Sequence, residues 1–430
     1  MSFSLSPIRP FRFVRNEYAT AYRGLPRRAW ILFAVNLVNS SGSMVFFFLS
    51  LYLTRKLGLA AARAGQVLSL YGFGSLAGAF SGGWLSDRVG SIRVQKLSLW
   101  ACGVFLIVLG QVTAVGLFMP LLFVFGLFAG MLYPANATSM ARTCPPELQV
   151  KGFALTRLAN NLGATIGPAV GGILALHDYR LLFWADGLTS LAAAALFGLL
   201  WTGTTAAGAS ANAAHASALP GPAPGEARPA RSPWRDVPFL LMMLIFLVWS
   251  IVFVQVLTTF PLYIRNVYGL PENRIGQLYA VNTMLIVALE MILMEKIRKY
   301  PLALMINVSF VMLGLGLGLM PFGRSFSFGA LTVAVWTFGE MLSMPLVAAL
   351  IAQRSDESNR GRYMGLSSFS FSLAFIIAPI VGMSVYGRFG GDAVWYICCG
   401  VSLLLALAFS VLRPYLHGAG PQQHAKKSTG

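Results

Sequence analysis

Long apolar runs, separated by short polar segments, divide the sequence from one end to the other. A helix rises about 1.5 Å per residue, so about 20 apolar residues cross the roughly 30 Å hydrocarbon layer of a membrane. Gly and Pro fall inside many of these runs, which membrane helices tolerate and soluble helices seldom do. The pattern predicts an all-α integral membrane protein with twelve transmembrane helices, at residues 29–53, 64–85, 97–116, 117–141, 153–176, 181–201, 237–262, 274–294, 302–321, 328–352, 363–386 and 393–412.

The two parts of the chain are related by an internal repeat. The stretch LYLTRKLGLAAARAGQ, from Leu51 to Gln66, returns as LYIRNVYGLPENRIGQ, from Leu262 to Gln277, at an offset of 211 residues. The same offset relates Tyr52 to Tyr263, Gly58 to Gly269, Gly65 to Gly276, Pro134 to Pro345, Pro168 to Pro379 and Trp184 to Trp395. Coincidence among glycine-rich runs is the alternative, but one unbroken register favours a true repeat. Two such halves form parallel repeats with a binding cavity between them near the midplane.

A low-complexity stretch, rich in Ala, Gly, Ser and Pro, separates the first six spans from the last six. Such a composition is typical of a flexible linker. The predicted organisation is a cytoplasmic N-terminal segment at 1–28, an N-terminal six-helix half at 29–201, a cytoplasmic linker at 202–236, a C-terminal six-helix half at 237–413 and a cytoplasmic tail at 414–430.

The charged residues indicate how the chain is oriented in the membrane. Only 11% of the residues are charged and the formal net charge is +18. The cations are spread between the spans and do not form a folded basic domain, which argues against a nucleic-acid partner. With the N-terminus inside, 23 of the 32 Lys and Arg residues lie on the cytoplasmic side and eight outside, while Arg157 lies within a span. The positive-inside rule therefore predicts a protein of the cell inner membrane, surrounded by lipids, with both termini cytoplasmic.

Enzymatic chemistry finds no support in the sequence. A catalytic site would need a nucleophile, a metal cluster or paired acids near an interface. The histidines and cysteines show no metal-ligand spacing, and no phosphate-binding loop is present. We therefore expect no enzyme, no cofactor and no metal, and instead a monomeric carrier for a small molecule. The residues concerned are His177, His215, His417, His424, Cys102, Cys144, Cys398 and Cys399.

A short motif follows the second span, where the sequence reads GGWLSDRVGSIR. Taken alone, it fits an ordinary cytoplasmic turn, with glycines for close contact and a capping carboxylate. It also resembles the G-x-L-x-D-R-x-G loop of the major facilitator superfamily. The resemblance implies the twelve-helix fold of that superfamily and a cytoplasmic latch between its halves. The latch residues would be Gly83, Asp87, Arg88, Gly90 and Arg93.

The fifth span carries NNLGATIGPAVGG, which is similar to the G-x-x-x-G-P-x-x-G-G motif of antiporters in that superfamily that export their substrates. Glycines four residues apart let helices approach closely, and proline bends the helix. Simple helix packing is the alternative role. The motif residues are Gly163, Gly167, Pro168, Gly171 and Gly172. In the fourth span, Gly126 stands where the drug and proton antiporters of the superfamily usually have an arginine.

Ionisable residues inside a span cost about 2.5 to 3.5 kcal/mol on insertion scales, so each is a candidate functional group. Glu340 lies near the middle of the tenth span, on one helix face with Thr337 and Ser343. Glu290 lies in the eighth span and Arg157 in the fifth. Glu340 and Glu290 are the candidates for proton coupling. The alternative is that each carboxylate is only a hydrogen-bonding group between helices or a partner of Arg157.

Other polar and aromatic residues within the spans are candidates for the wall of the substrate cavity. They are Asn39, Tyr133, Asn136, Arg157, Asn161, Gln255, Asn282 and Trp336. Asp186, in contrast, is expected to be an interfacial cap at the outer end of the sixth span. The sequence thus predicts a secondary transporter that moves a small amphiphilic molecule by alternating access, as proton-coupled efflux. An importer or a lipid flippase on the same scaffold is the alternative.

Overall fold

The computed structural model describes residues 24–201, 232–355 and 359–416, and these residues form helices joined by short turns, without a β-strand. The helices of the N-terminal half are α2 (Arg27–Gly42), α3 (Val45–Leu51), α4 (Ala61–Leu85), α5 (Ser91–Gln111), α6 (Val115–Thr143), α7 (Gln149–His177) and α8 (Arg180–Leu200). Those of the C-terminal half are α10 (Val237–Thr258), α11 (Phe260–Asn266), α12 (Glu272–Ile297), α13 (Leu302–Gly318), α14 (Phe326–Arg354), α15 (Arg360–Phe389) and α16 (Gly391–Leu416).

The described helices confirm the prediction of twelve spans. Ten stretches are long and apolar enough to cross a membrane, and one of them, Ala61–Gln111, contains both α4 and α5. The twelfth span is α7, which is 29 residues long but carries Arg157 and two asparagines in its first half. Two spans are broken into two helices each, because α2 continues into α3 and α10 into α11. Most of the predicted N-terminal segment, linker and tail lies outside the described residues.

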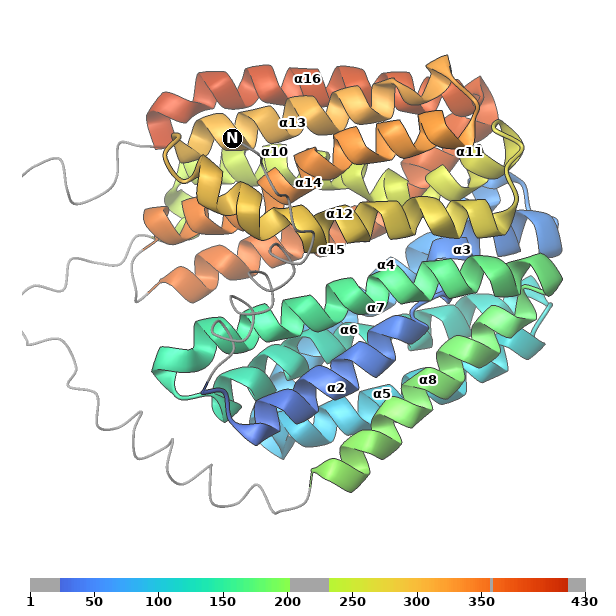
Figure 1. Cartoon of the computed structure of the whole chain (residues 1–430), viewed down its shortest axis with the longest axis horizontal. Coiled ribbons are helices and arrows are strands. Elements are labelled where there is room, and N and C mark those ends of the chain that lie inside the picture. Colours follow the sequence, from blue (N-terminus) through green and yellow to red (C-terminus); the bar gives the residue numbers. More distant parts are fainter. Residues whose placement is uncertain (1–23, 202–231, 356–358, 417–430) are drawn as a thin grey trace, which may run out of the picture.

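The two halves lie side by side and meet along two pairs of helices (Figure 1). Helix α4 packs on α15, and α7 packs on α12. We call the end of the molecule at which α2 and α10 begin and α8 and α16 end the open face. The opposite end, which carries residues 57–60 and 267–271, is the closed face.

The repeated connector ends the first span of each half in the same way. Gly58 has φ +69° and Gly269 has φ +67°, a left-handed conformation that glycine adopts without strain. Just beyond them, the backbone N–H of Leu59 donates to Leu53 at 3.0 Å, and that of Leu270 donates to Ile264 at 3.3 Å. Both hydrogen bonds reach back six residues, one more than in the usual glycine helix stop, and they close the last turn in the same way in both halves. The repeat therefore encodes one helix stop twice.

Other members of the repeat seal the closed face crosswise. A Cβ atom on Gly65 would lie 2.3 Å from the carbonyl oxygen of Pro379, and one on Gly276 would lie 2.2 Å from that of Pro168. Both distances are far inside van der Waals contact with rigid backbone. The glycine of each half thus docks on the proline of the other, so the same sequence feature makes both contacts.

A polar cluster strengthens this seal. Glu272, at the start of α12, is 5% exposed and accepts a hydrogen bond from the hydroxyl of Tyr179, 2.7 Å away in the other half. Its carboxylate also lies 3.1 Å from Arg265 of its own half and 3.9 Å from Arg55 of the other half. Burial raises the pKa of Tyr179, so the phenol remains a donor. The cluster joins the halves at the closed face.

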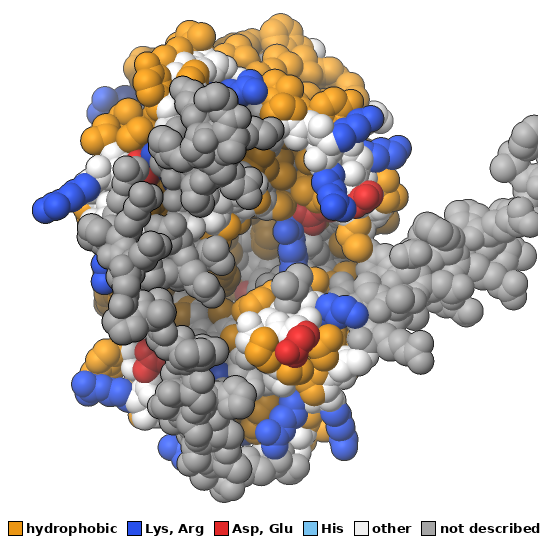
Figure 2. Space-filling model, turned by 90° about the vertical axis from the view of Figure 1, so that its left-hand side faces the viewer, with side chains coloured by type: hydrophobic (Ala, Val, Ile, Leu, Met, Phe, Trp, Pro, Cys, Tyr) orange, Lys and Arg blue, Asp and Glu red, His pale blue; other side chains and the backbone are white. Residues whose placement is uncertain are grey.

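One of these pairs, α4 and α15, diverges toward the open face. A Cβ atom added to Gly83 of α4, or to Gly361 or Gly365 of α15, would meet no described atom within 4 Å, in contrast to one on Gly65 of α4. Figure 2 views the open face and shows it hollowed between the two halves, with Lys and Arg side chains around the hollow. The halves therefore enclose a hollow that is accessible from one end.

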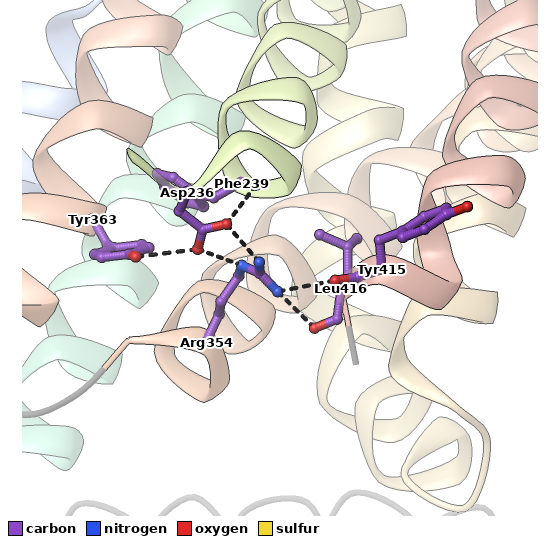
Figure 3. A network of polar contacts seen from close by, with 6 residues as sticks. All are labelled: Asp236, Phe239, Arg354, Tyr363, Tyr415 and Leu416. Atoms are coloured by element: carbon purple, nitrogen blue, oxygen red, sulfur yellow. Dashed lines mark hydrogen bonds and ion pairs between the residues drawn. The ribbon is translucent and has the colours of Figure 1, made fainter. Parts of the chain in front are cut away.

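A buried network holds four helices of the C-terminal half together at the open face (Figure 3). Asp236 caps α10 by accepting the N–H of Phe239, and its carboxylate receives both the Arg354 guanidinium, at 2.5 and 2.8 Å, and the Tyr363 hydroxyl, at 3.1 Å. Arg354 also donates to the carbonyl of Leu416 at the end of α16. Burial raises the pKa of Asp236, but Arg354 outweighs this effect and the pKa is lowered overall.

Replacing Arg354 with glutamine should destabilise the protein strongly, because it leaves the Asp236 carboxylate buried without a cation. Breaking such a pair costs about 3 to 5 kcal/mol. The measurement is the apparent melting temperature of the purified protein in detergent, with Arg298→Gln, an exposed arginine, as the control. The double variant Asp236→Asn with Arg354→Gln should recover part of the loss. An unchanged melting temperature for Arg354→Gln would contradict a stabilising role.

The lowered pKa of Asp236 also gives the sign of the pH dependence. The contribution of the pair is complete above the ordinary carboxyl pKa of about 3.9 and is lost as the pH falls through the lower folded value. The contribution of the pair to the melting temperature of the native protein should therefore persist from neutral pH down to about pH 5.

Candidate functional site

Glu340 lies in the middle of the tenth span. Helix α14 runs from Phe326 to Arg354, so the glutamate is fourteen residues, or roughly 21 Å, from either end. Its side chain is half-buried. The amide of Asn282 on α12 donates to Oε2 at 2.8 Å and to the hydroxyl of Thr337 at 2.9 Å. No hydrogen bond from a described residue reaches Oε1, which leaves this oxygen available to a proton or a ligand.

An ion pair spans the halves nearer the open face. Arg157 of α7 and Glu290 of α12 bind one another through a guanidinium nitrogen and a carboxylate oxygen. Both interact electrostatically with Glu340. Because Arg157 is paired with Glu290, the three groups together carry one net negative charge when Glu340 is ionised. The structure thus brings the three predicted charged residues into one cluster.

The predicted cavity residues separate into two groups. Asn282 and Arg157 belong to the charged cluster around Glu340. Tyr133 is 76% exposed, and Asn161 is half-buried on α7, one turn from Arg157. These residues remain candidates for contact with a substrate.

The other four predicted cavity residues make contacts within a single half. Gln255 is 3% exposed and donates to the carbonyl of Ala378, and Trp336 is 1% exposed and packs on Gly316. Asn39 accepts from Ser190 at 3.3 Å, and Asn136 is bonded to Gln95. Each of the four is hydrogen-bonded or packed between helices of a single half. Sequence alone could not distinguish these positions from cavity positions. A polar or aromatic residue in a span can hydrogen-bond or pack against neighbouring helices instead of facing a cavity.

The helix-five motif is a surface for two neighbouring spans. Cβ positions on Gly163 and Gly167 lie against the end of α2 and the break that follows it, and that on Gly171 lies against Met44 and Phe48. A Cβ on Gly172 would lie 2.6 Å from the carbonyl of Glu272, across the interface. Pro168 receives Gly276 in the same region. The motif therefore fixes the first span and seals the closed face.

The latch motif lies at the open face and bends around a π-helical turn at Ser86–Gly90. Asp87 lies 3.9 Å from Arg142 at the end of α6, and the Arg88 guanidinium stacks 4.1 Å above Trp84. Gly90 has φ +94°, and Arg93 is exposed. A Cβ atom on Gly83 would meet no described atom within 4 Å. These contacts of the motif all lie within the N-terminal half.

Asp186 differs from the expectation of an interfacial cap. It is 7% exposed and accepts the N–H groups of Met44 and Val45 at 3.2 and 3.1 Å, where the first span breaks between α2 and α3. The carboxylate thus satisfies backbone donors that the break leaves free. The break itself has no strong signal in the sequence, and the pairing of two distant helices could not be found without the structure.

Glu272 is a second residue that sequence reasoning missed. It follows Pro271 in the second copy of the repeated connector, where Ala61 stands in the first copy. Its acidic side chain beside Arg265 and Arg274 was the available signal, but its partners Tyr179 and Arg55 lie in the other half.

No group of three or more metal-ligating side chains occurs within residues 24–201, 232–355 and 359–416. The charged cluster contains two carboxylates and one guanidinium, and the guanidinium repels cations from Glu290. The arrangement suits the uptake and release of a proton or of a single positive charge at Glu340 more than it suits a metal.

Comparisons with known proteins agree with this architecture. A family model described as Major Facilitator Superfamily matches residues 31–354 and 338–429. A Na(+), Li(+), K(+)/H(+) antiporter of Planococcus maritimus is 26% identical over 381 residues, covering 82% of this chain and 88% of the relative. Multidrug resistance protein MdtG of Klebsiella pneumoniae (strain 342) is 26% identical over 429 residues, covering 90% and 94%. The crystal structure of peptide transporter POT in complex with sulfate superimposes with a TM-score of 0.76 at 17% identity, over 93% of this chain and 96% of that one, which shows the shared fold.

Proposed function

The chain belongs to the major facilitator superfamily, and we propose that it is a proton-coupled exporter of a small amphiphilic molecule. Membership makes it a multi-pass membrane transporter. The direction of transport, the coupling ion and the kind of substrate are our proposal. Glu340 is the observation that carries it.

Proton coupling needs a group that alternates between charged and neutral forms within the membrane. Such intramembrane carboxylates are typical of proton relays in transporters. Glu340 lies at mid-depth, and its Oε1 has no donor among the described residues. Its side chain is half-buried, so it is not fully enclosed by its neighbours in this conformation. These features support Glu340 as the proton site, with Glu290 paired to Arg157 beside it.

Exchange of a substrate against protons is supported by two further observations. The helix-five motif resembles that of exporting antiporters in the superfamily. The relatives named above include an antiporter that exchanges cations for H+ and a multidrug resistance protein, by their names. Both cover more than four fifths of this chain.

Alternating access requires the closed face to open when the hollow closes. The contacts that must separate are the two glycine–proline contacts, Gly65 with Pro379 and Gly276 with Pro168, together with the Glu272 cluster. The latch motif would then take part in the contacts that form at the open face, where Arg157 and Glu290 already join the halves.

Transport in proteoliposomes tests the proposed function. The purified protein is reconstituted, and accumulation of a panel of amphiphilic compounds is followed with and without an imposed pH gradient. We expect accumulation against a substrate gradient on the side from which protons leave. Transport that proceeds down the substrate gradient only, at a rate independent of the pH gradient, would overturn proton coupling. The sign of the gradient that drives accumulation also distinguishes export from import.

We also propose that the open face is cytoplasmic, because most Lys and Arg residues lie on that side. A single cysteine at Glu147, on the open face, should resist a membrane-impermeant thiol reagent in intact cells, while one at Thr113, on the closed face, should react. Both positions are exposed, so access to the reagent decides the result. The reverse pattern would invert the topology.

A further inference from the structure

The first span of the N-terminal half is broken about halfway along its length, and the first span of the C-terminal half is only bent. Ser43, between α2 and α3, has ψ +76°, which lies outside the helical region. At the bend between α10 and α11, Thr259 keeps helical angles, with φ −97° and ψ −30°. The backbone hydrogen bonds continue there, because Thr259 donates to Gln255 at 2.9 Å and Tyr263 donates to Thr259 at 3.0 Å. The break is therefore a feature of one half.

Asp186 of α8 closes this break. The N–H groups of Met44 and Val45 both donate to its Oδ2 atom, at 3.2 and 3.1 Å. The carboxylate is buried, and no described cation forms an ion pair with it. In the C-terminal half, the residue at the offset of 211 is Ile397. The carboxylate thus occurs in the half whose first span is broken.

Helix α2 is held on α8 by contacts that do not involve this carboxylate. A Cβ atom on Gly42 would lie 1.7 Å from the Oγ1 atom of Thr189, so the two helices touch at the end of α2. The hydroxyl of Ser190 donates to Asn39 at 3.3 Å. Among the described residues, the hydrogen bonds that tie the start of α3 to α8 all run to Asp186. The two parts of the first span are therefore attached to α8 separately.

The part beyond the break contacts the C-terminal half near its start. We call Val45–Lys56, which comprises α3 and the π-helical turn after it, the α3 segment. The ring of Phe46 lies 5.8 Å from that of Phe375 on α15, and the ring of Phe47 lies 4.8 Å from that of Tyr279 on α12. The segment also packs on α10 and α11. Four helices of the other half thus meet the start of this segment.

The far end of the α3 segment belongs to the seal of the closed face. Its Arg55 lies 3.9 Å from the carboxylate of Glu272, in the polar cluster that joins the halves. Because the segment contacts the other half at both of its ends, its angle to α2 decides whether these contacts form together. That angle is set at the break.

We propose that Asp186 is a positioning residue for transport, which anchors the start of the α3 segment while the segment turns about the break as the closed face opens. Both N–H groups bind one oxygen atom, and hydrogen bonds tolerate a range of angles, so the segment can turn without losing its attachment. Helix α2 stays on α8 during this movement. The inference rests on the alternating access of the proposed function, but not on the coupling ion or the direction of transport.

Distances between spin labels within the N-terminal half test the turning movement in the purified full-length protein. The labels are placed at Ala60, in the turn after the α3 segment, and at Leu181, at the start of α8; both positions are exposed. The reference pair is Gln111 with Leu181, which joins α5 to α8 without the α3 segment. Gly276→Ala, which obstructs the sealing of the closed face, should change the first distance and leave the reference distance unchanged.

Substitutions of Asp186 test the anchor. Asp186→Leu leaves both N–H groups without an acceptor, so the distance from Ala60 to Leu181 should change while Gly276 is native. The initial rate of transport in proteoliposomes should fall by roughly tenfold or more, as expected for the loss of hydrogen bonds to a charged group. Asp186→Asn should keep the native distance and transport within about threefold of native, because its amide oxygen accepts both N–H groups.

The matched control is Ser190→Ala, which removes a hydrogen bond between α8 and α2 instead of α3. It should keep the native distance and the native transport rate. A role of Asp186 in general packing of α8 predicts instead that Ser190→Ala shifts the distance as Asp186→Leu does. That result would overturn the inference.

The remaining outcomes separate this inference from the proposed function. The inference also fails if Asp186→Leu keeps the native distance from Ala60 to Leu181, or if Asp186→Asn loses transport as the leucine variant does. It fails, and the proposed function stands, if the halves separate in Gly276→Ala while that distance stays constant. If the distances change as expected but a pH gradient drives no transport, the proposed coupling fails and the anchor stands. The Gly276→Ala measurement decides the question if Asp186→Leu does not fold.

Discussion

Replacing Glu340 with glutamine is expected to abolish accumulation driven by a pH gradient. Glutamine has nearly the same shape but neither takes up nor releases a proton, so a cycle that depends on this carboxyl group cannot be driven. The exchange of substrate down its own gradient can persist, because the halves still alternate. The measurement is the initial rate and the final level of substrate in proteoliposomes with an imposed pH gradient, compared with Glu295→Gln.

A packing role for Glu340 predicts the opposite result. The glutamine variant would then retain pH-driven accumulation and gain stability, since a neutral amide is less costly to bury than a charge. The structure around Gly126 gives a reason why pH-driven transport should depend strongly on Glu340. Gly126 stands where related antiporters have an arginine, and a Cβ there would lie 2.5 Å from the carbonyl of Tyr71. The close crossing of α6 and α4 leaves no room for that arginine.

Replacing Gly276 with alanine should prevent the closed face from sealing. The added Cβ would lie 2.2 Å from the carbonyl oxygen of Pro168, and a backbone atom in a helix cannot yield as a side chain can. Overpacking of this kind costs about 1 to 3 kcal/mol, which shifts a two-state ratio by roughly fivefold to more than a hundredfold. We expect transport to fall accordingly and the closed face to be open in a larger fraction of molecules.

Spin labels at Leu176 and Arg274 measure the opening directly. Both positions are exposed at the closed-face ends of α7 and α12, next to the contact between Gly276 and Pro168. Their separation should increase in Gly276→Ala. Gly400→Ala is the matched control, because its Cβ would meet no described atom within 4 Å. Native transport and an unchanged label separation in Gly276→Ala would show that the contact between Gly276 and Pro168 does not close this face.

Much of the fold could be predicted from sequence because a membrane imposes strong and local rules. Each span must be apolar over a fixed length, so the twelve spans are visible as runs. The repeat was visible because its glycines and prolines occupy positions where the backbone conformation or a close helix contact requires them. Gly58 and Gly269 hold a left-handed conformation in which other residues are strained, so they persist where most identities have changed.

The candidate site was only partly predictable. Glu340, Glu290 and Arg157 stood out because charge inside a span is costly. Gln255 and Trp336 looked equally suited to a cavity, yet the packing of α10 on α15 and of α14 on α13 encloses them. Lipid and the protein interior are both apolar. The hydrophobic periodicity of an apolar helix therefore does not show which of its faces packs against a neighbouring helix.

The amino-acid sequence is enough to show that the chain crosses the membrane twelve times, as two related halves with a few charges inside the spans. Which of those charges pair, where the carboxylate of Asp186 acts and how the repeat seals one face follow from the packing of the helices. Local rules of burial and backbone conformation act within a single span. Pairing depends instead on contacts between residues more than a hundred positions apart, such as Gly65 with Pro379 and Arg157 with Glu290, which exist only once the two halves have packed together.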